Sequence, residues 1–148
     1  MTIAAALERE HRDIDNCLEA FRGDPGTAAD VLRTGVAALR RHIYLEEAFL
    51  FPPLRTAGLE MPVQVMLREH GQIWQLMDRA LAALDAGQVD PAVAAVDELM
   101  ALLERHNTKE EPVIYPHADT DLLPEQADQL DLFIGMGGMP EGWVCEYA

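Results

Sequence analysis

Two short stretches decide how this chain folds, His42-Ile43-Tyr44-Leu45-Glu46 and His106-Asn107-Thr108-Lys109-Glu110. Each places a histidine four residues before a glutamate. On an α-helix, residues four apart lie one turn apart on the same face, so the imidazole and the carboxylate can reach one metal ion. One such pair is a weak signal. Two pairs in similar surroundings predict a metal site between helices.

The two stretches belong to an internal repeat. The run Arg9-Glu10-His11-Arg12-Asp13-Ile14 resembles Arg68-Glu69-His70-Gly71-Gln72-Ile73, and the two H-x3-E stretches continue into Phe51-Pro52 and Tyr115-Pro116. Each half therefore carries one histidine and then one H-x3-E pair. Because only two copies exist, the repeat predicts a duplicated helical hairpin that closes into a bundle rather than an open array.

Length and composition limit the class of protein. A chain of 148 residues, 49% of them hydrophobic, is expected to fold as one domain. Its net charge of −15 argues against nucleic acid or an anionic membrane surface as a partner. No signal peptide and no stretch of membrane-spanning length is apparent. Cys17 and Cys145 form no CxxC motif, so we expect two free thiols and a cytoplasmic location.

The apolar pattern predicts an all-α protein. Apolar residues recur at helical spacing in four segments that begin near residues 2, 27, 62 and 90, and Pro52 is expected to end or bend the second. Short loops favour an antiparallel up-down-up-down four-helix bundle over residues 1–120. Residues 121–148 are expected to add a short helix near Pro124–Phe133. The irregular tail that follows either packs on the bundle as a strap or is partly mobile.

Six polar side chains replace apolar residues on the inward stripes of these helices. At about 1.5 Å per residue, all six fall at a similar depth from one end of the bundle. Buried without partners, each would cost about 1–3 kcal/mol, and a metal cluster removes that cost. Four imidazoles and two carboxylates suit Fe, Mn or Zn. Divided between the two halves, they predict two metal ions, each with two histidines, bridged by two glutamates. The predicted ligands are His11, His42, Glu46, His70, His106 and Glu110.

This pattern, together with the Glu-Glu and aromatic-Pro pairs that follow each H-x3-E, resembles the hemerythrin-like, or HHE cation-binding, family. The resemblance extends from about Leu7 to His117. It implies a four-helix bundle with an oxo- or hydroxo-bridged di-iron site, in which the histidines are terminal ligands and the two glutamates bridge. It also implies O2, NO or peroxide as small ligands, while leaving any protein partner open.

One position departs from the oxygen-carrying members of that family. They have a second histidine four residues after the ligand equivalent to His70, and this chain has Trp74 there. The resemblance then implies an iron with an open or water-filled position. We favour a metal- and O2-binding protein over a dedicated enzyme. The alternatives are a redox protein acting on O2, peroxide or NO or in iron–sulfur repair, and a module that senses iron or oxygen.

Several other residues are candidates either to support the ligands or to lie at the surface. Glu47 and Glu111 lie about 100° round the helix from the bridging glutamates, and Glu10 and Glu69 precede the lone histidines. His117 lies seven residues past Glu110, about 10 Å along a straight helix, so it is expected at the surface. Trp74 either shields the site or fills the core, and we expect the core. The remaining candidate is Tyr44, which is either close to the metals or an ordinary boundary residue.

Overall fold

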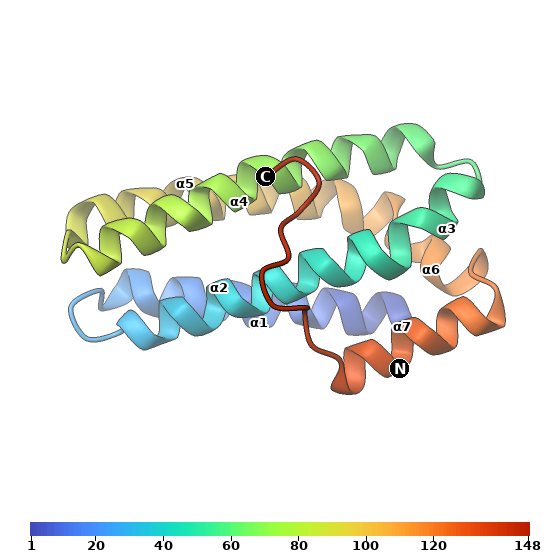
Figure 1. The fold of residues 1–148 in the computed structure, drawn as a ribbon, viewed down its shortest axis with the longest axis horizontal. Helices are drawn as coiled ribbons and strands as arrows, with labels where there is room; N and C mark the ends of the chain where they lie inside the picture. The colour runs from blue at the N-terminus through green and yellow to red at the C-terminus, as the bar shows by residue number, and fades with distance from the viewer.

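The computed structural model describes residues 1–148 and contains helices and connecting segments but no strand. Four helices are long: α1 (Ile3–Gly23), α2 (Ala29–Leu45), α4 (Glu60–Asp85) and α5 (Val89–Val113). They lie lengthwise beside one another as a helical bundle (Figure 1). The shorter elements are the π-helix η1 (Glu46–Leu50) and the helices α3 (Phe51–Thr56), α6 (Tyr115–Thr120) and α7 (Pro124–Met136). The predicted all-α class is confirmed.

The first backbone amides of α1 donate hydrogen bonds both to the adjacent residue Thr2 and to the distant residue Asp119. The Thr2 hydroxyl accepts a hydrogen bond from the Ala5 amide at 3.1 Å, the usual capping arrangement. The Asp119 carboxylate accepts from the amides of Ile3 at 2.9 Å and Ala4 at 3.2 Å. A negative charge at a helix N-terminus is favourable. The end of α6 is thereby fixed against the beginning of α1.

Pro52 does not end the second long helix. The chain continues from α2 through η1 into α3, which reaches Thr56. Pro52 and Pro53 lie in the first turn of α3, where a missing amide hydrogen costs little. The change of helix type comes earlier, at Glu46, and the Phe51 amide donates to the Glu46 carbonyl across the wide π turn. The expected break is therefore a local widening beside a predicted ligand.

Two apolar clusters fill the bundle. The larger is built around residues such as Leu18, Phe21 and Met77, and the smaller around residues such as Leu7 and Tyr115. The six predicted ligands are the buried polar and charged residues of the chain, and none belongs to either cluster. Apolar packing thus supplies the stability of the bundle on either side of one polar group of side chains.

The C-terminal segment crosses the bundle after α7 (Figure 1). Gln64 of α4 donates to the Tyr147 hydroxyl at 2.6 Å. The Tyr147 carbonyl oxygen passes 2.5 Å from where a Cβ on Gly71 would lie, so α4 accepts the tail only because position 71 is glycine. The tail, residues 137–148, therefore packs on the bundle, and we call it the strap. No helix of the chain is both long and apolar enough to cross a membrane.

Candidate metal centre

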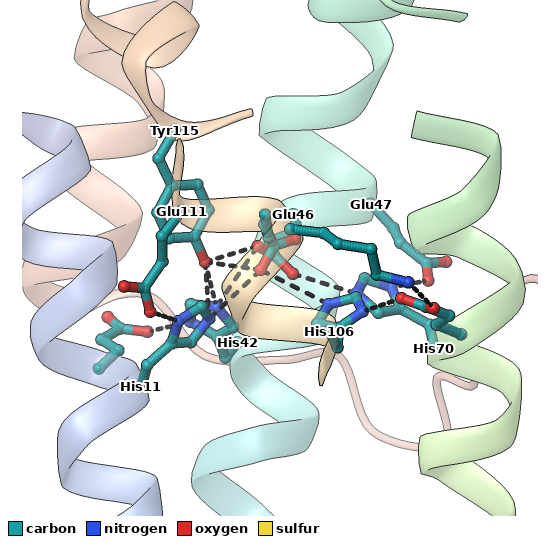
Figure 2. A network of polar contacts seen from close by, with 12 residues as sticks. His11, His42, Glu46, Glu47, His70, His106, Glu111 and Tyr115 are labelled. Atoms are coloured by element: carbon teal, nitrogen blue, oxygen red, sulfur yellow. Dashed lines mark hydrogen bonds and ion pairs between the residues drawn. The ribbon is translucent and has the colours of Figure 1, made fainter. Parts of the chain in front are cut away.

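The six predicted ligands come together inside the bundle. Figure 2 labels the four histidines and Glu46 among them. Their exposed fractions range from 0% for Glu46 and Glu110 to 5% for His11. They form two groups of four, and within each group one donor atom per residue lies within 4.8 Å of the others. The first group contains His11 and His42, the second contains His70 and His106, and both glutamates belong to both groups.

The Nε2 atoms of all four histidines face the shared carboxylates. His11 Nε2 lies 3.3 Å and His106 Nε2 3.5 Å from Glu110 Oε1. On the other carboxylate, His70 Nε2 lies 3.1 Å from Oε1 of Glu46, and His42 Nε2 lies 3.4 Å from its Oε2. The two imidazoles nearest each glutamate come one from each group. Each carboxylate therefore stands between the two groups, as a bridging ligand does.

A second carboxylate binds the outer nitrogen of every histidine. The Nδ1–O distances are 2.7–2.9 Å, and each pair joins two different helical elements. Such a bond fixes the tautomer and the ring orientation, leaving Nε2 free to bind a metal. The four pairs are His11–Glu111, His42–Glu10, His70–Glu47 and His106–Glu69.

Three of these outer carboxylates make a further polar contact with another residue. Arg41 donates to Glu10 at 3.3 Å and also binds the backbone carbonyls at the end of α7. Lys109, the single lysine of the chain, contacts Glu69. The backbone amide of Glu146 in the strap donates to Glu47 at 3.0 Å. Residues beyond the bundle therefore help to position the imidazoles.

One further residue belongs to this cluster and was not predicted from the sequence, Tyr115. Its side chain is fully buried, and its phenol oxygen lies among the ligands of the first group (Figure 2). That oxygen is 2.8 Å from Glu46 Oε2 and 3.0 Å from Glu110 Oε1, to which the hydroxyl donates. It is also 2.8 Å from His11 Nε2 and 2.9 Å from His42 Nε2.

A break in α5 brings Tyr115 to this place. In a straight α-helix a residue five positions after Glu110 would lie about 140° away round the axis. Pro112 lies inside the last turn of α5, which ends at Val113, and α6 begins at Tyr115. A proline inside a helix removes a hydrogen bond and disturbs the preceding turn. The one sequence signal was the repeat, which pairs Tyr115 with Phe51.

Electrostatics show how the cluster is balanced without a metal. Burial by itself would lower the pKa of His42, but the Glu46 carboxylate and a second carboxylate raise it to about 10. The pKa of His106 is also raised to about 10, by Glu110 against the effect of burial. Burial would raise the pKa of Glu110, yet the imidazoles hold it well below its usual range. Protons on the imidazoles thus compensate the two buried carboxylates.

The cluster nevertheless leaves donor atoms unused. Glu46 Oε1, Glu110 Oε2 and His70 Nε2 are buried and have no hydrogen-bond partner. Glu46 Oε1 and His70 Nε2 are 3.1 Å apart but lack the geometry of a hydrogen bond. Unpaired buried polar atoms are costly, and a cation within each group would satisfy all three. The residues present therefore fit a metal centre.

Three predicted candidates lie elsewhere. Tyr44 packs in an aromatic group with its ring centroid 5.0 Å from Trp143 and 5.5 Å from that of Phe133. Trp74 is buried in the larger apolar cluster, with the Arg40 guanidinium 4.9 Å from its ring. His117 is half-buried, and its Nδ1 atom lies 2.6 Å from a carboxylate oxygen of Asp121. None of the three makes a polar contact with the cluster.

A small cavity of about 10 Å³ adjoins the four imidazoles. It has room for about one water-sized molecule. The rest of its lining is mainly aliphatic and includes Ile14, Leu39 and Ile73. Asp15 and Asn107 line both this cavity and a larger, polar cleft of about 940 Å³ formed by residues of α1 and α5. These two side chains therefore stand between the cleft and the imidazoles.

Comparison with known proteins agrees with this geometry. The family model of the hemerythrin HHE cation-binding domain matches residues 2–118. The chain therefore belongs to the hemerythrin HHE cation-binding family, as its motifs predicted. Neither the curated proteins nor the solved structures contain a match to it. Membership of this family and the buried histidine–glutamate cluster are together compatible with a metal-binding protein.

Proposed function

We propose that this chain holds two iron ions and binds O2 or a related diatomic ligand. The observation that carries the proposal is the sharing of Glu46 and Glu110 by two groups of donors. In the proposed centre His11 and His42 bind one ion, His70 and His106 bind the other, and the two carboxylates bridge. Mixed nitrogen and oxygen donors without thiolate suit iron, with Mn and Zn as substitutes.

The proposed centre joins the two halves of the repeat. We infer that the four long helices form the antiparallel up-down-up-down bundle over residues 1–120, with residues 121–148 packed on it. This arrangement supports the proposal because each carboxylate then binds imidazoles from both hairpins. Free Cys17 and Cys145 fit a reducing compartment, which we take to be the cytoplasm.

The residues of the chain would perform three tasks around the ions. The outer carboxylates hold the imidazoles so that Nε2 faces the centre. The aliphatic residues on either side keep bulk water away and lower the local dielectric. The cavity of about 10 Å³ beside the imidazoles leaves room only for very small ligands. Iron would supply one-electron exchange and affinity for a diatomic molecule.

Metal analysis joined to optical spectroscopy tests the proposal. Metal-free chain is titrated with ferrous ion under argon, desalted, and analysed for iron per chain and for absorption before and after exposure to air. We expect two irons per chain and ligand-to-iron charge-transfer absorption in the near ultraviolet after exposure. Binding of less than one iron per chain, with no such absorption, would contradict the proposal. A Glu110→Ala chain serves as the control that lacks a bridging carboxylate.

A second function, redox turnover of O2, peroxide or NO, is favoured by one observation. Trp74, which replaces the fifth histidine of oxygen carriers, lies in the apolar core and supplies no donor. The ion held by His70 and His106 would therefore have a position open to reactive ligands. Stopped-flow mixing of the ferrous protein with O2, peroxide and NO distinguishes the two functions. A stable, reversible O2 adduct supports carriage or sensing, and rapid oxidation of the irons supports turnover.

A further inference from the structure

The two halves of the centre differ at one position. Phe51 follows Glu46 by five residues, and Tyr115 follows Glu110 by five residues. Both rings are buried and lie against the lone histidine of a half, Phe51 at 5.5 Å from His70 and Tyr115 at 5.3 Å from His11, centroid to centroid. The two positions are therefore structurally equivalent. Only one of them carries an oxygen atom.

Different local structures bring both rings to this place. After Glu46 the π turn of η1 places the fifth residue over the first, and the Phe51 amide donates to the Glu46 carbonyl. After Glu110 the same result comes from the break between α5 and α6. π turns inside helices are frequently found at functional sites. The chain departs from regular α-helix twice, and each departure directs an aromatic ring at the centre.

The spacing around the Tyr115 oxygen matches that of a coordination polyhedron. In an octahedral site with bonds of about 2.1 Å, adjacent donors lie about 3.0 Å apart. The Tyr115 oxygen is 2.8–3.0 Å from four donor atoms, one each from His11, His42, Glu46 and Glu110. Two edges among those four, His11–Glu110 and His42–Glu46, measure 3.3 Å and 3.4 Å. The phenol oxygen thus has the spacing of a fifth donor to the same ion.

We propose that Tyr115 is a protein ligand of the ion bound by His11 and His42, whereas the ion bound by His70 and His106 lacks such a ligand. This inference rests on the proposed function. Without an ion, the buried Tyr115 hydroxyl serves only as a hydrogen-bond donor to the two carboxylates. With an ion bound, both carboxylates would direct their lone pairs to the ion, and the hydroxyl would lose its acceptors.

Coordination requires a simple exchange. The metal–oxygen bond forms, the O–H bond of Tyr115 breaks, the proton passes to the buffer, and no electron moves. Without an ion the phenol is a hydrogen-bond donor to the Glu46 and Glu110 carboxylates, and so it carries its proton. The ion supplies the positive charge that makes the phenolate stable in this position.

The proposal makes the centre asymmetric. The His11 and His42 ion would have five protein donors, and the His70 and His106 ion would have four. Phe51 lies against His70 with a hydrocarbon ring and supplies no donor. An incoming diatomic molecule would therefore bind at the His70 and His106 side.

The test is the optical and resonance Raman spectrum of chain loaded with two ferrous ions and then exposed to air. A phenolate bound to ferric iron gives a visible charge-transfer band, and excitation in that band enhances phenolate ring vibrations. We expect both signals in the unaltered chain. We expect Tyr115→Phe to remove them and the control Tyr44→Phe, in the aromatic group outside the centre, to keep them. The Raman signal of the unaltered chain does not depend on the folding of any variant.

Iron content separates the ways in which the test can fail. Two irons per chain without phenolate vibrations would overturn the role of Tyr115 and leave the proposed function standing. A band that persists in Tyr115→Phe with two irons would also overturn it. If the unaltered chain holds no iron, the proposed function fails and the inference fails with it.

Discussion

The Nδ1 atom of His11 lies 2.8 Å from a carboxylate oxygen of Glu111, a residue 100 positions further along the chain. The bond crosses from α1 to α5 and so joins the first and last long helices. Equivalent bonds run from His42 to α1, from His70 to η1 and from His106 to α4. The four bonds form a closed ring of helix-to-helix contacts around the inner donors.

Removing one outer carboxylate should weaken metal binding without removing a ligand. In Glu111→Ala the His11 ring loses the acceptor that fixes its tautomer, and metal affinity should fall about 10- to 100-fold. Glu111→Gln keeps an acceptor and should lose less. The measurement is competition with a chelator of known affinity. Glu98→Ala, which removes a surface partner of Arg79, is the control, and an equal loss there would contradict the assignment.

Metal should stabilise the fold strongly. Four of the six inner donors come from α1, α4 and α5, and two from the α2–η1 segment, so bound ions would cross-link all four long helices. A ligand that binds only the folded chain adds about 2.7 kcal/mol at 100 times its dissociation constant. Thermal unfolding should therefore shift upward with added ferrous ion under argon. The same addition should leave the melting temperature of a Glu46→Ala, Glu110→Ala chain unchanged.

The meeting of the six buried histidines and glutamates was predictable because their signal is local and repeated. Histidine and glutamate four apart must share a helix face, and the lone histidines recur in the same Arg-Glu-His frame. The outer carboxylates could also be named as candidates from the sequence, since each is adjacent to one of these six residues. Tyr115 was not predictable in this way, because a constant 100° per residue would turn its side chain away from that of Glu110. Pro112 signalled a kink, but the direction of the chain after it depends on tertiary packing.

Metal-free chain should lose stability as the pH rises above neutrality. The pKa values of His42 and His106 are raised from 6.5 to about 10 in the fold. A raised folded pKa gives stability that is complete below pH 6.5 and is lost as the pH rises through about 10. The free energy of unfolding should fall by on the order of 1 kcal/mol per pH unit for each histidine in that interval. Urea unfolding between pH 6 and 9 measures it.

The control for this pH dependence is His106→Gln, which should unfold with a shallower slope than the unaltered chain. A slope that is unchanged by the substitution, or stability that is constant up to pH 9, would show that the imidazoles do not carry the compensating protons.

The strap should support the His70 side of the centre. Its Glu146 amide donates to Glu47 at 3.0 Å, and Glu47 binds His70 Nδ1 at 2.7 Å. A chain shortened by residues 141–148 keeps α7 but loses this bond, and it should bind its second metal ion several-fold more weakly. Tyr147→Phe, which removes only the hydroxyl bonded to Gln64, is the matched control. Unchanged binding of both ions by the shortened chain would exclude a role for the strap.

A hydroxyl added at Phe51 should close the open side of the centre. Phe51 lies against His70 as Tyr115 lies against His11, with centroid distances of 5.5 Å and 5.3 Å. Phe51→Tyr would place a second phenol oxygen beside the His70 and His106 ion, where we expect exogenous ligands to bind. Azide, a small anion that reports an open ferric position, should then bind at least about tenfold more weakly, a change of about 1.4 kcal/mol. Optical titration of the air-exposed iron protein measures this.

The control for the Phe51→Tyr prediction is Phe49→Tyr, in the aromatic group with Tyr44 and Phe133. It adds the same atom away from the centre and should bind azide as the unaltered chain does. Equal azide affinity in all three proteins would place the ligand position elsewhere.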